Sequence, residues 1–235
     1  TMAFNEKNIK IHLRYWVCKL ILIIIVYFCR HKMDTTYNIN DIEMEKSALQ
    51  IARGAYLPKL PKALAGAVKV KEGAPTQSVD NHDEIKKLFP NTYGMPVVEF
   101  VESDETMGFR VNVGVILSGG QAPGGHNVIT GLFDQLKKLN PENRLYGFIL
   151  GPSGLVEHDY IELTKDVIDD YRNTGGFDMI GSGRTKLEEE EQFEKGLEIL
   201  RELDIKALVI IGGDDSNTNA CVLAEYYAAK NTGVQ

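Results

Sequence analysis

The sequence predicts an α/β protein with a doubly wound, mostly parallel sheet and helices on both faces. Three apolar runs of strand length lie at residues 111–117, 144–150 and 207–211, and each run stops at a turn that contains glycine. Between these runs, apolar residues recur with the period of a helix that packs on a sheet. Strands that alternate with helices are typical of parallel sheets, whose ligands bind at the carboxyl ends of the strands.

The first run leads into Ser-Gly-Gly-Gln-Ala-Pro-Gly-Gly-His-Asn at residues 118–127, and its four glycines exceed what a chain reversal requires. The segment is not a Walker A loop, because no Gly-Lys-Ser/Thr follows, and it is not Gly-x-Gly-x-x-Gly. Backbone amides would therefore have to bind any phosphate here without a loop lysine. The helix that follows carries an apolar stripe at Val128, Ile129, Leu132, Phe133 and Leu136. His126 is predicted to pack or to cap this helix rather than to act as a base.

The second run ends in the turn at residues 151–154, and a further strand is predicted at 178–180. That strand would lead into Gly-Ser-Gly-Arg at residues 181–184. A guanidinium at a strand end can bind phosphate oxygens through two parallel hydrogen bonds, which makes Arg184 a candidate anion-binding residue. The alternative is a surface arginine with no ligand.

The third run is followed by Gly-Gly-Asp-Asp at residues 212–215, and a helix is predicted to begin at Ser216. The glycines can close the chain around a ligand, and the amides of a helix N-terminus favour anions. Two carboxylates at such a place are explained if a cation also binds, as when Mg²⁺ lies between an aspartate and phosphate oxygens. We therefore expect a magnesium-phosphate site. The alternative is an ordinary turn with an aspartate as the N-cap.

Composition limits the classes of function. With 235 residues and 43% apolar composition, the chain can bury a sizeable core. A net charge of −7 without a basic stripe argues against a nucleic-acid partner. The three cysteines lack metal-ligand spacing, so a reducing cytoplasm is the simplest setting.

We divide the chain into a hydrophobic leader at residues 1–32, an extension at 33–110 and an α/β domain at 111–235 that carries the site. The apolar run at 16–29 would span roughly 21 Å as a helix, short of the ~30 Å hydrocarbon core, and no small-x-small cleavage site follows it. We interpret the leader as non-native or translated from upstream, so that membrane association is not expected; a membrane anchor through 16–29 is the alternative. The extension is helical and irregular and is interrupted by prolines, and we assign it no chemistry.

The two glycine turns together carry a resemblance. The segment at 118–127, and Gly-Gly-Asp-Asp-Ser-Asn-Thr-Asn-Ala at 212–220, resemble the phosphofructokinase family and, within it, the diphosphate-dependent branch. The ATP-dependent branch has Gly-Gly-Asp-Gly-Ser at the second turn, so Asp215 is the mark of the branch. The resemblance covers roughly residues 45–235, which correspond to the amino-terminal portion of a longer family chain.

The resemblance implies a phosphotransferase of glycolysis. It would transfer phosphate reversibly from diphosphate to the 1-hydroxyl of fructose 6-phosphate with Mg²⁺, giving fructose 1,6-bisphosphate in the cytoplasm. Such chemistry depends on positioning and charge neutralisation. The resemblance assigns backbone contacts with diphosphate to Gly119, Gly120 and Gly124. It also implies that Arg184 binds phosphate oxygens and that Asp214 holds the metal.

Two further positions would select the phosphate donor. The carboxylate of Asp215 would stand where the α-phosphate of a nucleotide lies. Two like charges at about 4 Å repel by roughly 4 kcal/mol at an effective dielectric near 20, which corresponds to about a thousandfold. Asn219 replaces a glycine that packs beside adenine in the ATP-dependent branch, and this also favours diphosphate.

One departure from the family pattern concerns catalysis. The family's base lies in a Pro-Lys-Thr-Ile-Asp-Gly-Asp segment, which is expected beyond Gln235, so we assign no catalytic residue within this chain and expect the chain alone to be inactive. The full-length form is expected to be a homo-oligomer. The alternatives are another Gly-Gly-Asp phosphotransferase, of the NAD-kinase or lipid-kinase type, and a non-catalytic fragment or binding module.

Overall fold

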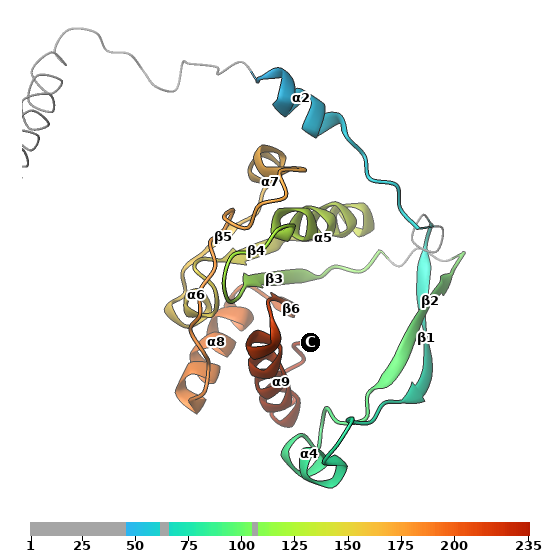
Figure 1. Ribbon diagram of the computed structural model, residues 1–235, viewed down its shortest axis with the longest axis vertical. Helices are drawn as coiled ribbons and strands as arrows, with labels where there is room; N and C mark the ends of the chain where they lie inside the picture. Colours follow the sequence, from blue (N-terminus) through green and yellow to red (C-terminus); the bar gives the residue numbers. More distant parts are fainter. Residues whose placement is uncertain (1–45, 62–65, 105–107) are drawn as a thin grey trace, which may run out of the picture. The chain divides into compact units, whose positions relative to one another are not determined.

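The structure, a computed structural model, describes residues 46–61, 66–104 and 108–235 (Figure 1). The chain divides into two compact units, residues 1–46 and 47–235, and only the second is described below. The predicted leader at 1–32 and the possible anchor at 16–29 lie outside the described residues. Within the described ranges, no helix is long and apolar enough to cross a membrane.

The α/β part is built on a four-stranded sheet in the order β5-β4-β3-β6. The strands are β3 (Asn112–Leu117), β4 (Leu145–Phe148), β5 (Tyr160–Glu162) and β6 (Ile205–Ile211). Strand β3 is parallel to both of its neighbours, whereas β5 runs antiparallel to β4. This confirms the predicted mostly parallel sheet. At the carboxyl end of β3, Leu117 lies opposite Ile211 of β6, so both strands end at one edge.

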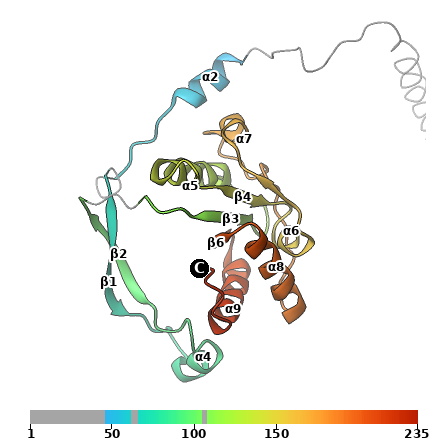
Figure 2. The same ribbon diagram turned by 180° about the vertical axis from the view of Figure 1, so that it is seen from behind.

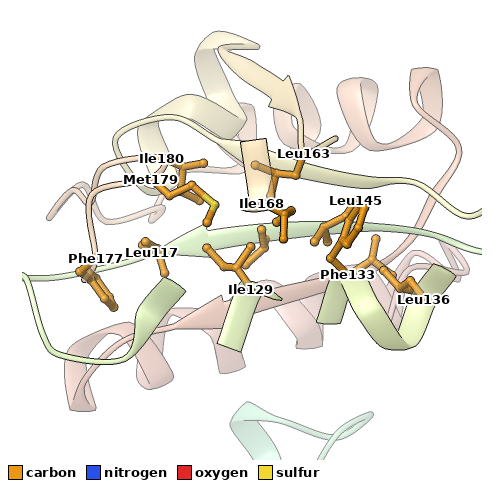
Figure 3. Packing of buried hydrophobic residues seen from close by; sticks show 12 residues of the cluster. Leu117, Ile129, Phe133, Leu136, Leu145, Leu163, Ile168, Phe177, Met179 and Ile180 are labelled. Carbon is orange, nitrogen blue, oxygen red and sulfur yellow. The ribbon is translucent and has the colours of Figure 1, made fainter. Parts of the chain in front are cut away.

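Helices cover both faces of this sheet (Figures 1 and 2). On one face, α5 (Gly125–Leu139) and α7 (Lys165–Tyr171) pack over an apolar cluster (Figure 3). On the other face, α6 (Pro152–Glu157), α8 (Glu190–Glu202) and α9 (Asp214–Ala229) contribute to a second cluster. Because successive side chains of a strand point to opposite faces, Val115 joins the first cluster and Ile116 the second. All six residues of β3 are therefore buried.

Two sequence predictions on this part were wrong in position. Residues 178–180 do not form a strand. Leu150 donates its N–H to the carbonyl of Ile180, and a strand-like pairing nearby is the isolated bridge between Ser118 and Gly183. The edge of the sheet is taken by β5 instead. Helix α9 begins at Asp214 rather than at Ser216, because Gly213 is the N-cap. Both aspartates consequently lie in the first turn of the helix, where carboxylates complement the dipole.

The extension contains α2 (Ala48–Ala55), β1 (Val68–Pro75), α4 (His82–Leu88) and β2 (Pro96–Glu102). Strands β1 and β2 form an antiparallel pair that the sequence patterns did not indicate. The turn before β2 is tied to α9 by one carboxylate, since Glu225 accepts the backbone N–H groups of Asn91 and Thr92 at 3.0 Å each. Although desolvation raises the pKa of Glu225, these hydrogen bonds and those from the two side chains outweigh it and lower the pKa.

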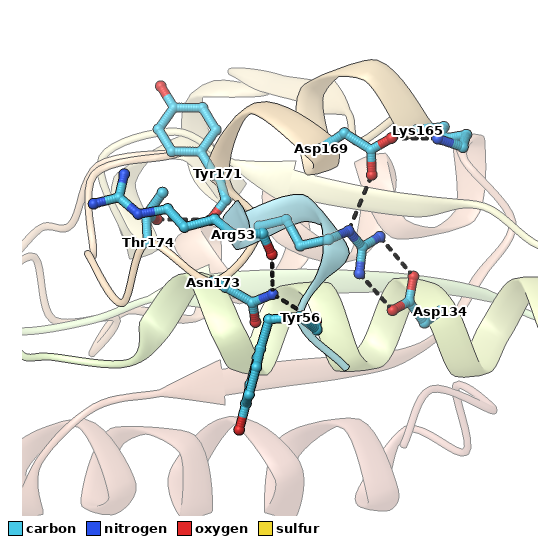
Figure 4. A network of polar contacts seen from close by, with 9 residues as sticks. Arg53, Tyr56, Asp134, Lys165, Asp169, Tyr171, Asn173 and Thr174 are labelled. Atoms are coloured by element: carbon cyan, nitrogen blue, oxygen red, sulfur yellow. Dashed lines mark hydrogen bonds and ion pairs between the residues drawn. The ribbon is translucent and has the colours of Figure 1, made fainter. Parts of the chain in front are cut away.

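A polar network links α2, α5 and α7 (Figure 4). The guanidinium of Arg172 binds both carboxylate oxygens of Asp134, at 2.7 and 2.9 Å, and its Nε donates to Asp169 at 3.0 Å. The hydrogen bonds to Asp134 raise the pKa of Arg172. The neighbouring Asn173 donates its side-chain amide to the carbonyls of Arg53 and Tyr56, at 2.7 and 3.0 Å, which ties the end of α2 to this layer.

Candidate functional site

The two glycine turns meet at the carboxyl edge of the sheet. Ser118, which follows β3, donates its N–H to the carbonyl of Ile211 at 2.7 Å. The hydroxyl of Ser216 in α9 donates to the hydroxyl of Ser118 at 2.8 Å, and both side chains are buried. The convergence follows from topology, because neighbouring parallel strands end at the same edge.

A pocket of about 260 Å³ opens where these turns meet. Its lining residues are Ser118, Gly119, Arg184, Thr185, Lys186, Asp215, Ser216 and Asn219. Of the residues selected from the sequence, Gly119, Arg184, Asp215 and Asn219 are therefore brought together. Three segments that are far apart in the sequence supply the walls: the turn after β3, the segment before α8, and the first turns of α9.

Arg184 is one of two exposed cationic residues that line this pocket, together with Lys186. Within the part of the chain that the structure describes, its guanidinium has no hydrogen-bond acceptor and no carboxylate partner. It lies against Gly120, where an added Cβ would fall 2.9 Å from Nη2. The N–H of Gly120 likewise has no acceptor among the described residues. The guanidinium, which lines the pocket, thus lies next to Gly120, which does not line it, and both groups are available to an anion.

The other two predicted backbone donors are engaged. Gly119 donates its N–H to the carbonyl of Gly183 at 2.7 Å, and Gly124 donates to the carbonyl of Gly175 at 2.8 Å. Gly124 does not line the pocket; it is the N-cap of α5 and its φ of 96° suits glycine. Of the three predicted backbone donors, Gly120 is thus the one whose N–H has no acceptor among the described residues.

The two aspartates of the second turn differ in their surroundings. Asp215 lines the pocket, its side chain is 88% exposed, and one carboxylate oxygen lies 3.9 Å from Nζ of Lys186. Asp214 does not line the pocket, and its exposed carboxylate has no partner among the described residues. The described part of the chain contains no group of three or more His, Cys, Asp or Glu side chains that could hold a metal ion. Lys186 was not selected from the sequence; its only signal there was its closeness to Arg184.

Comparison with known proteins decides the family. The model for phosphofructokinase matches residues 112–234, more than half of the chain and including both glycine turns. The chain belongs to the phosphofructokinase family.

Among curated relatives of this phosphofructokinase-family chain, pyrophosphate–fructose 6-phosphate 1-phosphotransferase of Porphyromonas gingivalis is 66% identical over 193 residues, which are 82% of this chain and 35% of the relative. The enzyme of the same name from Entamoeba histolytica is 51% identical over 189 residues, 79% of this chain and 35% of the relative. The chain thus spans about a third of the length of these relatives. A solved pyrophosphate-dependent phosphofructokinase from Nitrosospira multiformis matches with a TM-score of 0.47 and 22% identity, over 53% of this chain and 32% of that one.

Asn219 of this phosphofructokinase-family chain has a defined structural role. Its Oδ1 accepts the N–H of Leu187 at 3.0 Å, and its Nδ2 donates to the carbonyl of the same residue at 2.5 Å. Leu187 is 2% exposed and packs in the second apolar cluster. Asn219 therefore joins α9 to the segment that carries Arg184.

His126 packs, as predicted, and is not among the residues that line the pocket. Its ring is 1% exposed, and Nε2 accepts the backbone N–H groups of Asp178 and Met179 at 2.9 Å each. Nδ1 lies 2.7 Å from the hydroxyl of Thr174, so the neutral ring with its proton on Nδ1 satisfies these three hydrogen bonds, while Oδ1 of Asp178 lies 3.0 Å from Nε2. Burial lowers the pKa of His126 despite the nearby carboxylate of Asp178.

Proposed function

We propose that this chain carries the diphosphate-binding part of a diphosphate-dependent 6-phosphofructokinase. The enzyme would transfer phosphate reversibly from diphosphate to the 1-hydroxyl of fructose 6-phosphate, giving fructose 1,6-bisphosphate and phosphate. The names of the relatives support this substrate pair. The observation that carries the proposal is the guanidinium of Arg184, which lines the pocket at the start of α9, lies against Gly120 and has no partner among the residues that the structure describes.

The donors and cations around the pocket suit a small, highly charged anion. Diphosphate is a compact, strongly anionic group, and a guanidinium can donate two parallel hydrogen bonds to its oxygens. The backbone N–H of Gly120 and the N-terminus of the 16-residue helix α9 add favourable dipoles at the same place. Lys186 supplies a second cation to the pocket wall. Phosphoryl transfer needs this kind of positioning and charge neutralisation rather than covalent catalysis.

The residues present fit a magnesium ion that is bound together with the substrate. Mg²⁺ usually takes one or two protein carboxylates and completes its shell with phosphate oxygens and water. The carboxylate of Asp214 is exposed and unpartnered in the described part of the chain, and we propose it as the protein ligand. When bound, the ion would neutralise charge on the phosphate oxygens.

Titration calorimetry with the 235-residue chain tests the proposed donor. We expect saturable binding of magnesium diphosphate and weaker binding of magnesium ATP and of inorganic phosphate. Tighter binding of ATP than of diphosphate would contradict the proposal and favour a nucleotide-dependent phosphotransferase. Absence of binding to all three ligands would favour a non-catalytic module.

Replacing Asp215 by glycine should relax the preference for diphosphate, but less than the sequence suggested. Because the side chain is 88% exposed and faces Lys186, water screens its charge, and repulsion at 4 Å is nearer 1 kcal/mol, or about fivefold. The measurement is the ratio of dissociation constants for magnesium ATP and magnesium diphosphate in parent and variant. Asp215→Asn is the matched control, since it removes the charge and keeps the shape. If Asn left the ratio at the parent value while Gly changed it, charge would not be the selector.

Replacing Gly120 by alanine should disturb the pocket without disturbing the fold. The added Cβ meets only the mobile end of the Arg184 side chain, which can move aside, so the free energy of unfolding should change by less than about 1 kcal/mol. The displaced guanidinium should weaken magnesium diphosphate binding about tenfold. Gly131→Ala in α5 is the control, because no atom lies within 4 Å of the added Cβ. Equal affinities for the two variants would contradict the proposed contact.

The setting of the enzyme is also part of the proposal. We place it in the cytoplasm as a glycolytic homo-oligomer, on the basis of the family resemblance and the phosphorylated sugar substrate. Gel filtration coupled to light scattering tests the oligomeric state of the longer protein, for which a monomer would contradict the proposal.

A further inference from the structure

We infer that Asn219 is a positioning residue that holds the segment Arg184–Lys186 over the pocket. This segment is called the strap below. The inference deepens the proposed function and rests on it for the identity of the anion. Asn219 would act through the backbone of Leu187 and would not contact the diphosphate itself.

The backbone of the strap is hydrogen-bonded at both ends and, among the described residues, makes no backbone hydrogen bond between them. At its start, Gly183 accepts the N–H of Gly119 at 2.7 Å and donates its own N–H to the carbonyl of Leu117 at 3.4 Å. At its end, Leu187 is held by the two hydrogen bonds from the side chain of Asn219. Between these points, Arg184, Thr185 and Lys186 are exposed, and their N–H groups donate to no backbone carbonyl of the described residues. The position of both pocket cations therefore depends on the two anchors.

Asparagine suits the second anchor because one side chain must satisfy both backbone groups of a buried residue. The acceptor Oδ1 meets the N–H of Leu187 and the donor Nδ2 meets its carbonyl, as a neighbouring strand would. A glycine or alanine at this position would leave both groups without a protein partner, which is costly near the 2% exposed Leu187. An aspartate would present a carboxylate oxygen to the carbonyl.

Asn219, the anchor, lies on the same helix as Asp215, the residue proposed to select the phosphate donor. Asp215 and Asn219 are four residues apart on one helix, so they share a face, and both line the pocket. One helical turn therefore carries the carboxylate that faces Lys186 and the amide that fixes the segment to which Lys186 belongs. A shift of the strap would move Arg184 and Lys186 together.

Amide exchange and binding, measured on the 235-residue chain, test this inference. Asn219→Ala should speed hydrogen exchange at the Leu187 amide about tenfold, because one hydrogen bond is lost. It should also weaken magnesium diphosphate binding about tenfold. In an Arg184→Ala background, the effect of Asn219→Ala on affinity should shrink to about twofold, because coupled residues are not additive. Thr218→Ala is the control: among the described residues, the Thr218 hydroxyl bonds to the carbonyl of Asp214 within α9 and to no other group.

The outcomes separate the inference from the proposed function. Unchanged exchange at Leu187 in Asn219→Ala would overturn the anchor. Faster exchange with a full, additive loss of affinity in the Arg184→Ala background would overturn the claim that Asn219 acts through the strap. If the parent chain bound no diphosphate but the variant showed faster exchange, the proposed function would fail and the anchor would stand. Should Asn219→Ala not fold, Asn219→Asp serves instead, because its carboxylate oxygen would repel the carbonyl of Leu187. This variant should also speed exchange at Leu187 and weaken binding; exchange at the parent rate would then count against the anchor.

Discussion

Replacing Arg184 by alanine is expected to weaken the binding of magnesium diphosphate about 100-fold, because a hydrogen bond between charged groups contributes about 1.5–3 kcal/mol to the free energy of binding. The guanidinium has no competing partner in the described part of the chain, so its whole hydrogen-bonding capacity is available to the ligand. Removing it should leave the fold intact, since the side chain is exposed. Calorimetry measures the affinity, and urea unfolding measures the stability.

Two further variants serve as controls for Arg184→Ala. Arg184→Lys keeps the charge but loses the planar pair of donors, so it should recover only part of the affinity. Arg201→Ala removes another exposed arginine, in the last turn of α8 and outside the pocket lining, and should bind like the parent. Affinity within a factor of about two of the parent for Arg184→Ala would contradict the role given to this residue.

Replacing Gly183 by alanine is expected to cost about 3 kcal/mol in the free energy of unfolding. An added Cβ would lie 1.9 Å from the carbonyl oxygen of Leu150, and backbone atoms cannot move aside as a side chain can. Gly183 also bonds to Leu117 and Gly119, so relief of the clash would separate the strap from the turn after β3. Chemical denaturation should show the loss, and the residual folded protein should bind diphosphate poorly.

Gly213→Ala is the matched control for this substitution. No atom lies within 4 Å of a Cβ built there, and its φ of −88° is open to any residue. Its unfolding free energy should stay within about 1 kcal/mol of the parent. If Gly183→Ala were as stable as Gly213→Ala, the close contact between residues 150 and 183 could not be present in the protein.

The strands and helix faces could be predicted from the sequence because their signals are local. The apolar run at 111–117 and the stripe that follows have the periods of a buried strand and a packed helix. The strand prediction for residues 178–180 was wrong because the apolar side chains there are buried, although the backbone forms no strand pairing. Strand β5, with three residues, is too short to give a period.

The candidate site was predictable in outline for a topological reason. Parallel neighbours bring their carboxyl ends to one edge, so the two glycine turns were expected to meet. Which amides remain available was not predictable, because the N–H groups of Gly119 and Gly124 are taken by carbonyls of residues 183 and 175, far away in sequence. The same holds for Asn219 and Leu187, which are 32 residues apart.

The strength of the donor selector also depended on the structure. From sequence alone, Asp215 could be given the dielectric of a partly buried site. Its 88% exposure and the nearby Lys186 reduce the expected discrimination by about two orders of magnitude.

The central claim is that the turn after β3, the strap and the start of α9 form one anion site. The most direct measurement follows backbone amide signals by NMR while magnesium diphosphate is added to the 235-residue chain. We expect the amide signals of Gly120, Arg184 and Asp215 to shift together along one saturation curve, while the signal of Gly124, whose amide is hydrogen-bonded, moves little. Shifts that begin elsewhere, or that leave Gly120 and Asp215 on different curves, would contradict it.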